Sequence, residues 1–224
     1  MEQLKHLLSC KKISALFAGV AFILFLTGCE TTSPFHRVSG TGAFDTVVID
    51  AGHGGHDNGA RAKAGNFEKV LTLDTTRRLA ATLRKAGLNV VETRTGDYFV
   101  TLDDRVQFSN RLKNSIFVSV HYNWSNRSGA RGIETYYMNP NSARLASRIQ
   151  KKMLGVYSSP DRGIKTRSLY VLRNNKRPSV LCELGFVSNP SENKVLQDSR
   201  QRQRLAESIA AAILAEYEAN KPQL

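Results

Sequence analysis

The chain has 224 residues and carries 32 lysines and arginines against 19 acidic residues, which gives a net charge of +13. With three cysteines, no disulfide framework is expected, so an ordinary apolar core must stabilise the fold. This charge suits a polyanionic partner, but the basic residues are scattered along the sequence. We therefore predict no binding site from them.

The N-terminus has the pattern of a secretory signal. A basic start precedes an uncharged apolar run, Ile13 to Leu26, which is shorter than the roughly twenty residues that a membrane span needs. The next residues, Leu26 to Cys29, match the lipobox of bacterial lipoproteins. This resemblance implies cleavage before Cys29 and acylation of its thiol, and Glu30, in place of Asp, implies sorting to the outer membrane. An ordinary signal anchor is the alternative.

Export determines the location and partners that we expect. The signal peptide would span residues 1–28, and the mature protein would be lipid-anchored in the cell envelope, at the outer membrane and facing the periplasm. Anionic envelope polymers or lipid headgroups then replace nucleic acid as expected partners, because electrostatic attraction does not distinguish between polyanions. Residues 29–45 are polar and rich in Thr, Ser and Gly, which predicts a flexible tether.

From residue 46 to 224 the sequence predicts one α/β domain. Short β-branched runs indicate strands at 47–50, 89–93, 116–121, 132–138, 169–172 and 180–184. Amphipathic patterns indicate helices at 67–86, 101–112, 142–156 and 202–219, and Thr101 is a plausible N-cap. Alternation of this kind predicts a sandwich of helices around a mostly parallel or mixed sheet.

Two histidines follow apolar strands. His53 lies in a glycine-rich loop after the strand at 47–50, and His121 ends the strand at 116–121. Functional groups gather beyond the carboxyl ends of strands in open α/β sheets, so the two imidazoles can converge on one metal. A lone histidine after a strand is more often structural, and a glycine loop can bind phosphate, but the nucleotide-binding spacings are absent. His56 is a weaker candidate, whose simpler interpretation is a solvated loop histidine.

Two glutamates complete the candidate site. Glu68 falls in the first turn of the predicted helix 67–86, where an acidic residue is stabilising without any chemistry, but its spacing from His53 favours a ligand role. Glu183 interrupts an apolar strand, where a buried carboxylate costs free energy unless it is paired or its pKa changes. A salt bridge to an arginine would explain Glu183; the functional explanation is a general base with a raised pKa.

Together these motifs resemble the zinc-dependent N-acetylmuramoyl-L-alanine amidases, the family that includes septum-splitting and spore-wall enzymes. The match runs from about Thr46 to the C-terminus, and separate motifs in the right order are more specific than any one of them. The motifs are Asp50 to Gly55 with Asp57 and Gly59-Ala60, Glu68, Ser119 to His121 with Asn123, Gly132 to Glu134, and Glu183 to Asn189.

The resemblance implies a single three-layer α/β domain on a six-stranded sheet, which cleaves the amide between muramic acid and L-alanine in peptidoglycan. His53, Glu68 and His121 would bind one zinc ion, and Glu183 would take a proton from the attacking water and return it to the leaving nitrogen. Glu134 would lie behind the ligands and orient a histidine or a loop. Asn123 would belong to the substrate rim.

One departure from the family bears on regulation. Septum-splitting members carry a plugging helix between the second histidine and the catalytic glutamate, but here the interval 121–183 is already filled by the predicted strands and helix. We therefore expect an open groove, no obligatory protein activator and a monomer. Two rivals remain: a zinc peptidase that cuts within the stem peptide, and a non-catalytic lipoprotein that binds peptidoglycan.

Overall fold

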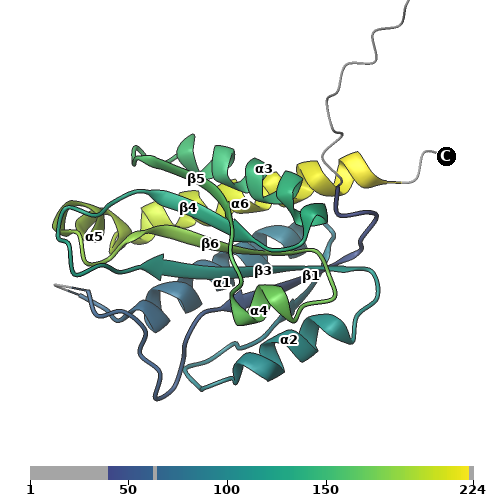
Figure 1. Cartoon of the computed structure of the whole chain (residues 1–224), viewed down its shortest axis with the longest axis horizontal. Helices are drawn as coiled ribbons and strands as arrows, with labels where there is room; N and C mark the ends of the chain where they lie inside the picture. The colour runs from purple at the N-terminus through teal and green to yellow at the C-terminus, as the bar shows by residue number, and fades with distance from the viewer. Residues whose placement is uncertain (1–39, 63–64, 222–224) are drawn as a thin grey trace, which may run out of the picture. The chain divides into compact units, whose positions relative to one another are not determined.

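The protein folds around one six-stranded mixed sheet (Figure 1), in a computed structural model that describes residues 40–62 and 65–221. The strands are β1 (Thr46–Ala51), β2 (Asn89–Glu92), β3 (Ser115–Asn123), β4 (Ile133–Tyr137), β5 (Asp161–Thr166) and β6 (Ser179–Phe186). They lie in the order β2-β1-β3-β6-β4-β5, and only the pairing of β4 with β6 is antiparallel. The carboxyl ends of β1, β3 and β6 therefore meet at one edge.

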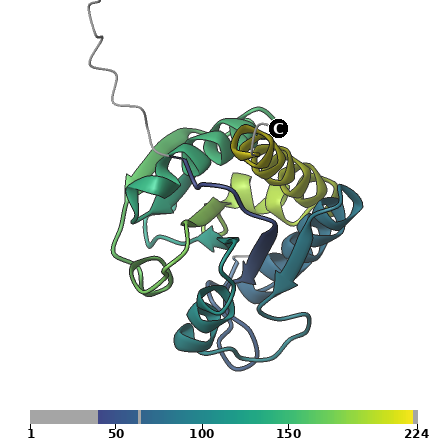
Figure 2. The ribbon, with the colours of Figure 1, turned by 90° about the vertical axis from the view of Figure 1, so that its right-hand side faces the viewer.

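Helices cover both faces of this sheet (Figure 2). They are α1 (Glu68–Lys85), α2 (Leu102–Asn110), α3 (Ala143–Leu154), α4 (Tyr170–Arg173), α5 (Pro190–Leu196) and α6 (Ser199–Asn220), and a short 3₁₀ helix spans Pro140–Ser142. The long helices α1, α3 and α6 pack together on one face, whereas the shorter α2 and α4 lie on the other. This three-layer arrangement confirms the predicted fold class.

Strand alternation makes the two faces different. On β1, Val47 joins the large core beneath α1, α3 and α6, whereas Val48 joins a smaller cluster beneath α2 and α4. We call these sides the helical face and the site face. Because successive side chains of a strand point to opposite faces, Asp50, His121 and Glu183 all lie on the site face.

One predicted element needs correction, and two elements were missed. Residues 169–172 were expected to form a strand, but Tyr170–Arg173 forms the one-turn helix α4 on the site face. A short apolar run cannot distinguish a buried strand from a buried helical turn. The edge strand β5 and the helix α5 were missed, because β5 is largely exposed and lacks an apolar run, while α5 has only seven residues. The predicted N-cap of α2 is confirmed, since the Thr101 hydroxyl accepts a hydrogen bond from the Asp104 amide at 3.1 Å.

The segment that precedes β1 packs against the domain. The sequence predicts a tether up to residue 45, yet Phe44 is buried in the large core and its ring meets Tyr217 edge-on at 5.6 Å. The Thr41 amide donates to Glu216 Oε1 at 3.3 Å. The folded part therefore begins before residue 46. The predicted signal peptide and Cys29 lie outside the described residues.

Within residues 40–62 and 65–221, no helix combines the length and hydrophobicity that a membrane span requires.

Candidate metal centre

His53, Glu68 and His121 meet at the carboxyl edge of the sheet. One potential ligand atom from each lies within 4.8 Å of the others. His53 Nε2 is 3.1 Å from Glu68 Oε2, and His121 Nδ1 is 3.1 Å from Glu68 Oε1. The predicted convergence of these three residues is therefore confirmed geometrically.

Glu68 is the first residue of α1, and its carboxylate is held from several directions. Its Oε1 accepts the Tyr122 amide at 2.9 Å and its Oε2 accepts the Ala60 amide at 2.8 Å. Burial raises the pKa of Glu68, but the hydrogen bonds and charges of His121 and His53 outweigh it, so the pKa lies well below its usual range. Glu68 is therefore an anion in a nearly closed site, which favours a cation between it and the two imidazoles.

His53 has an unusual backbone for its residue type, with a φ of 63° in the left-handed region. Its carbonyl accepts a hydrogen bond from Arg105 Nη2 at 2.8 Å, and its Nδ1 lies 2.8 Å from Asp57 Oδ2. Burial lowers the pKa of His53, but Glu68 and Asp57 outweigh it and raise the pKa. Asp57 thus fixes the ring so that Nε2 faces Glu68, as carboxylates do behind metal-bound histidines.

A buried ion pair between Asp50 and Arg105 supports the loop that carries His53. Asp50 Oδ1 accepts from Arg105 Nη1 at 2.6 Å and from Thr93 at 2.7 Å, and Ser119 donates to Oδ2 at 2.7 Å. Burial raises the pKa of Asp50, but Arg105 and the two hydroxyls outweigh it and lower the pKa. Arg105 therefore joins the strand end to the His53 carbonyl, and this network holds the strained loop in place.

Two glycines let the loop approach the ligands closely. A Cβ on Gly52 would lie 2.3 Å from His121 Cε1, and a Cβ on Gly59 would lie 2.6 Å from His53 Cδ2 and 2.7 Å from Glu68 Oε2. Any side chain at these positions would displace a candidate ligand. Gly52 and Gly59 are therefore needed to leave space for the three candidate ligands.

The donor set fits zinc. Two imidazole nitrogens and one carboxylate oxygen are the ligand types of catalytic zinc sites that keep an open position for water. Asp57 accepts a hydrogen bond from His53, as a carboxylate behind a metal-bound histidine does. Gly52 and Gly59 leave the space that the candidate ligands occupy. The structure thus contains a possible His-Glu-His metal site.

Glu183 lies next to this cluster without an ionic partner. It pairs with His121 in the register of β3 and β6, and its Oε2 is buried with no hydrogen-bond partner among the described residues. Within the same part of the chain, no Lys or Arg lies within ion-pair distance of it. Burial raises the pKa of Glu183 well above its usual range, Glu68 and Glu134 add to this, and Arg167 partly offsets it. The salt-bridge explanation of this residue is therefore wrong.

Glu134 pairs with Glu183 in the register of β4 and β6, and it contacts Asn123 at the end of β3. Glu134 accepts hydrogen bonds from Asn123 Nδ2 at 2.6 Å, from the Tyr136 hydroxyl at 2.6 Å and from Arg162 Nε at 3.1 Å. Asn123 Oδ1 in turn accepts the Trp124 amide at 2.8 Å. Glu134 was predicted to orient either a histidine ligand or a loop. Its hydrogen-bond partners include no histidine, so its contacts agree with the second role, in which it orients a loop.

The remaining loop histidine is separate from the cluster. His56 is exposed, and its ring packs on Phe99 with 4.2 Å between ring centroids. The roles of Asp57 and Arg105 were not predicted from the sequence. The spacing of Asp57, four residues after His53, was a usable signal, whereas nothing in the sequence pointed to Arg105.

Two clefts flank the cluster. The first, of about 720 Å³, includes Glu183 and Trp124 in its lining together with Arg127, Arg162, Lys165 and Arg167; we call it the basic cleft. The second, of about 410 Å³, includes His53 and His121 with Phe99, Tyr170, Val171 and Leu181; we call it the apolar cleft. Leu169 lines both, so the segment before α4 forms the wall between them.

Comparisons with known proteins agree with this geometry. The family described as N-acetylmuramoyl-L-alanine amidase matches residues 47–215. The uncharacterised protein YqiI of Bacillus subtilis is 40% identical over 177 residues, which are 77% of this chain and 85% of YqiI. The amidase LytC of the same organism is 35% identical over 177 residues, and there the match covers 77% of this chain but 36% of LytC. The catalytic domain of CwlV, an N-acetylmuramoyl-L-alanine amidase from Bacillus (Paenibacillus) polymyxa, superposes with a TM-score of 0.75 at 37% identity, covering 80% of this chain and 100% of that domain.

Proposed function

Because the chain belongs to the N-acetylmuramoyl-L-alanine amidase family of cell-wall enzymes, we propose that it hydrolyses the amide between muramic acid and L-alanine with one zinc ion held by His53, Glu68 and His121. The observation that carries the proposal is the convergence of these three residues beside the half-buried Glu183, whose Oε2 is buried without a hydrogen-bond partner among the described residues. A binding protein without activity would have no need to keep a carboxylate oxygen buried and unpaired, because its desolvation costs free energy.

Zinc in this site would lower the pKa of a water molecule and polarise the amide carbonyl. Glu183 takes a proton from the attacking water as the oxygen bonds to the acyl carbon. It then returns that proton to the alanine nitrogen as the carbon–nitrogen bond breaks. The raised pKa of Glu183 suits both steps, since a general base that must also act as an acid works best with a pKa near the operating pH.

The surrounding residues keep the candidate zinc ligands and the cleft lining in position. Asp57 accepts the proton of His53 Nδ1, which leaves Nε2 as the ligand atom that faces Glu68. Arg105 fixes the His53 carbonyl and Asp50 together. Glu134 positions Asn123, and through it the loop that begins at Trp124 and lines the basic cleft.

We further propose that the protein is anchored through a lipid on Cys29 and works at the outer membrane, facing the periplasm. The lipobox motif supports the anchor. The topology is compatible with it, because the chain enters β1 at Thr46 while the candidate site lies beyond Ala51, at the other end of the same strand. A tether that precedes the domain would therefore start opposite the site. Fractionation of cells that express the Cys29→Ser variant tests this, and continued membrane retention would contradict it.

We also propose that the groove is active without a partner and that the protein is a monomer. In the described interval between His121 and Glu183, the strands and α3 pack into the domain, and both clefts border the site. Trp124 at the rim is 56% exposed. The purified protein should therefore digest peptidoglycan by itself, and inactivity that is relieved only by an added envelope protein would contradict this.

Mass spectrometry of muropeptides tests the reaction itself. Purified zinc-loaded protein should release free stem peptides that begin at L-alanine, and a chelator should stop the release until zinc is restored. Shortened stems that remain on muramic acid would instead indicate a stem-peptide peptidase. Binding to peptidoglycan without any released fragment would indicate a non-catalytic lipoprotein.

A further inference from the structure

The basic cleft has more positive charge than its own carboxylates can neutralise. Four basic side chains line it, and the acidic lining residues are Glu134 and Glu183. Arg162 and Lys165 both pair with Glu134. A bulge permits this double contact: β4 residues 133 and 135 face β5 residues 161 and 164, so that two side chains three positions apart reach the same carboxylate.

The other two cations have no such partner. No carboxylate in the part of the chain that the structure describes lies within ion-pair distance of Arg127 or Arg167. Arg167 is nevertheless held in place, because its guanidinium lies over the Tyr136 ring, 5.3 Å from the centroid, and its amide donates to the Tyr137 carbonyl at 2.9 Å. A positioned but unpaired guanidinium in a cleft suits a carboxylate ligand, which it can bind through two parallel hydrogen bonds.

The position of Glu183 decides which part of the substrate enters this cleft. Under the proposed function, Glu183 returns a proton to the leaving nitrogen, so the peptide arm must lie on the side of the cluster that Glu183 lines. That side is the basic cleft, whereas the opposite cleft is lined mainly by apolar side chains and suits the uncharged acyl side of the amide.

We propose that the basic cleft recognises a free carboxylate on the peptide arm of the substrate, and that Arg127 and Arg167 are the residues that select it. This inference rests on the proposed function, which supplies the reaction and the direction of the substrate. It goes beyond that function by assigning the peptide side of the site and the chemical group that this side prefers.

Two synthetic muramoyl dipeptides test the proposal. Both carry L-alanine as the first residue and a second residue whose side-chain carboxyl is blocked, and they differ only in whether the α-carboxyl of the second residue is free or a carboxamide. Binding is measured by calorimetry on the Glu183→Gln variant, and kcat/KM is measured on the zinc-loaded wild-type protein. We expect about a tenfold preference for the free carboxylate in both measurements, the size of one charge-assisted contact in a partly exposed site.

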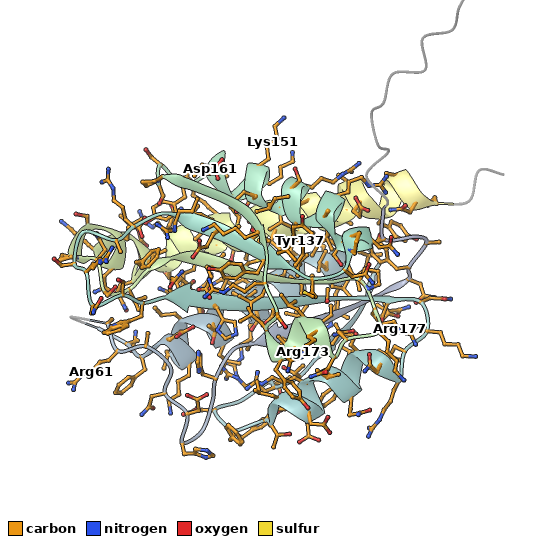
Figure 3. All side chains as sticks on the ribbon, in the orientation of Figure 1. Arg61, Tyr137, Lys151, Asp161, Arg173 and Arg177 are labelled. Carbon is orange, nitrogen blue, oxygen red and sulfur yellow. The ribbon has the colours of Figure 1, made fainter. Side chains whose placement is uncertain are left out.

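The variants Arg127→Gln and Arg167→Gln should reduce this preference by raising KM for the carboxylate substrate more than for the carboxamide substrate. The ratio of kcat/KM between the two substrates should therefore fall toward one, and this ratio cancels any effect that the lost charge of Arg167 has on Glu183. Lys151→Gln is the matched control: it removes one positive charge from an exposed position on α3, where the side chain points away from the domain (Figure 3). The control should keep the full preference.

The outcomes separate this inference from the proposed function. Equal binding and equal turnover of the two dipeptides by the wild-type cleft would overturn the carboxylate subsite while leaving the amidase activity intact. An equal loss on both substrates in the arginine variants, with a shifted pH profile, would also overturn it, because the arginines would then act through Glu183. A binding preference without cleavage of either lactyl amide would overturn the proposed function and leave the carboxylate subsite standing.

Discussion

The two faces of the sheet use the same strands for opposite purposes. On the helical face, residues such as Val47, Ile116 and Val180 are fully buried beneath α1, α3 and α6. On the site face, the alternate residues of the same strands include Asp50, His121 and Glu183. This face has the thinner cover, which α2 and α4 provide. One face supplies stability, and this leaves the other free to carry polar groups that cost stability.

Two glutamates, the buried Glu216 and the half-buried Glu183, show the difference most clearly. Glu216 on α6 is fully buried and pairs with Arg144 at 2.9 Å and Arg148 at 3.2 Å. Burial raises its pKa, but Arg144, the Thr41 amide and Asn220 outweigh it and lower the pKa. Glu183 has no such partners, and its pKa is raised. The same residue type is thus a structural anion on one face and, in the proposed reaction, a proton carrier on the other.

The largest effect that we predict comes from Glu183→Gln. The variant should lose about a thousandfold in kcat, because the amide cannot accept a proton from water, and it should keep its zinc. Muropeptide release and metal content measure the two properties. Glu207→Gln, an exposed change on α6, is the matched control and should be fully active. Substantial turnover by Glu183→Gln would remove this residue from proton transfer.

The same variant separates activity from stability. When the pKa of a carboxyl group is higher in the folded than in the unfolded state, the folded protein becomes less stable as the pH rises from the unfolded to the folded pKa. The metal-free Glu183→Gln variant should therefore gain thermal stability over wild type as the pH rises from acid to neutral. A melting temperature below that of wild type at neutral pH would show that Glu183 is a paired structural residue.

A cavity in the large core should cost stability without touching the chemistry. Leu79 on α1 is fully buried on the helical face, and Leu79→Ala should lower the free energy of unfolding by about 3 kcal/mol. Denaturant titration measures this loss, and activity per folded molecule should be unchanged. Leu102→Ala, at a leucine that is 53% exposed on α2, should leave stability nearly unaltered. Equal losses in both variants would contradict the division between the faces.

Removing the charge of Glu216 should cost about 2 kcal/mol at neutral pH, because Arg144 and Arg148 lose their common partner. The lowered pKa means that this contribution is complete above the unfolded pKa and is lost as the pH falls through the folded pKa. Glu216→Gln should thus have a flatter loss of stability in acid than wild type. Glu218→Gln, at an exposed position, is the control and should follow the wild-type curve.

The smallest effect should come from Asp57→Asn. The amide oxygen still accepts the His53 Nδ1 proton but carries no charge, so zinc should bind about tenfold more weakly. Competition with a fluorescent chelator measures this affinity, and Asp103→Asn on the exposed start of α2 is the control. Unchanged zinc binding would show that Asp57 supports the loop and not the metal.

Residues that interrupt a strong local pattern could be predicted from the sequence, whereas elements that depend on distant contacts could not. His121 and Glu183 could be found because each breaks an apolar strand pattern that is strong by itself. The exposed strand β5 has no such pattern, so it was missed together with Arg162 and Lys165, which its bulge directs to Glu134. The turn at Tyr170–Arg173 was assigned to the wrong class because its apolar residues are buried in either conformation.

The sequence by itself determined the alternation of strands and helices, the places where polar groups end apolar strands, and the set of residue types that can bind zinc. These are local properties, set by periodicity and by the cost of burying charge. Only the tertiary structure decided that His53, Glu68 and His121 share one point, that Asp57 and Arg105 hold the loop, and that unpaired arginines gather on the Glu183 side. Apart from the local pair of His53 and Asp57, those contacts join residues far apart in the chain, and their geometry depends on strand register and on one bulge.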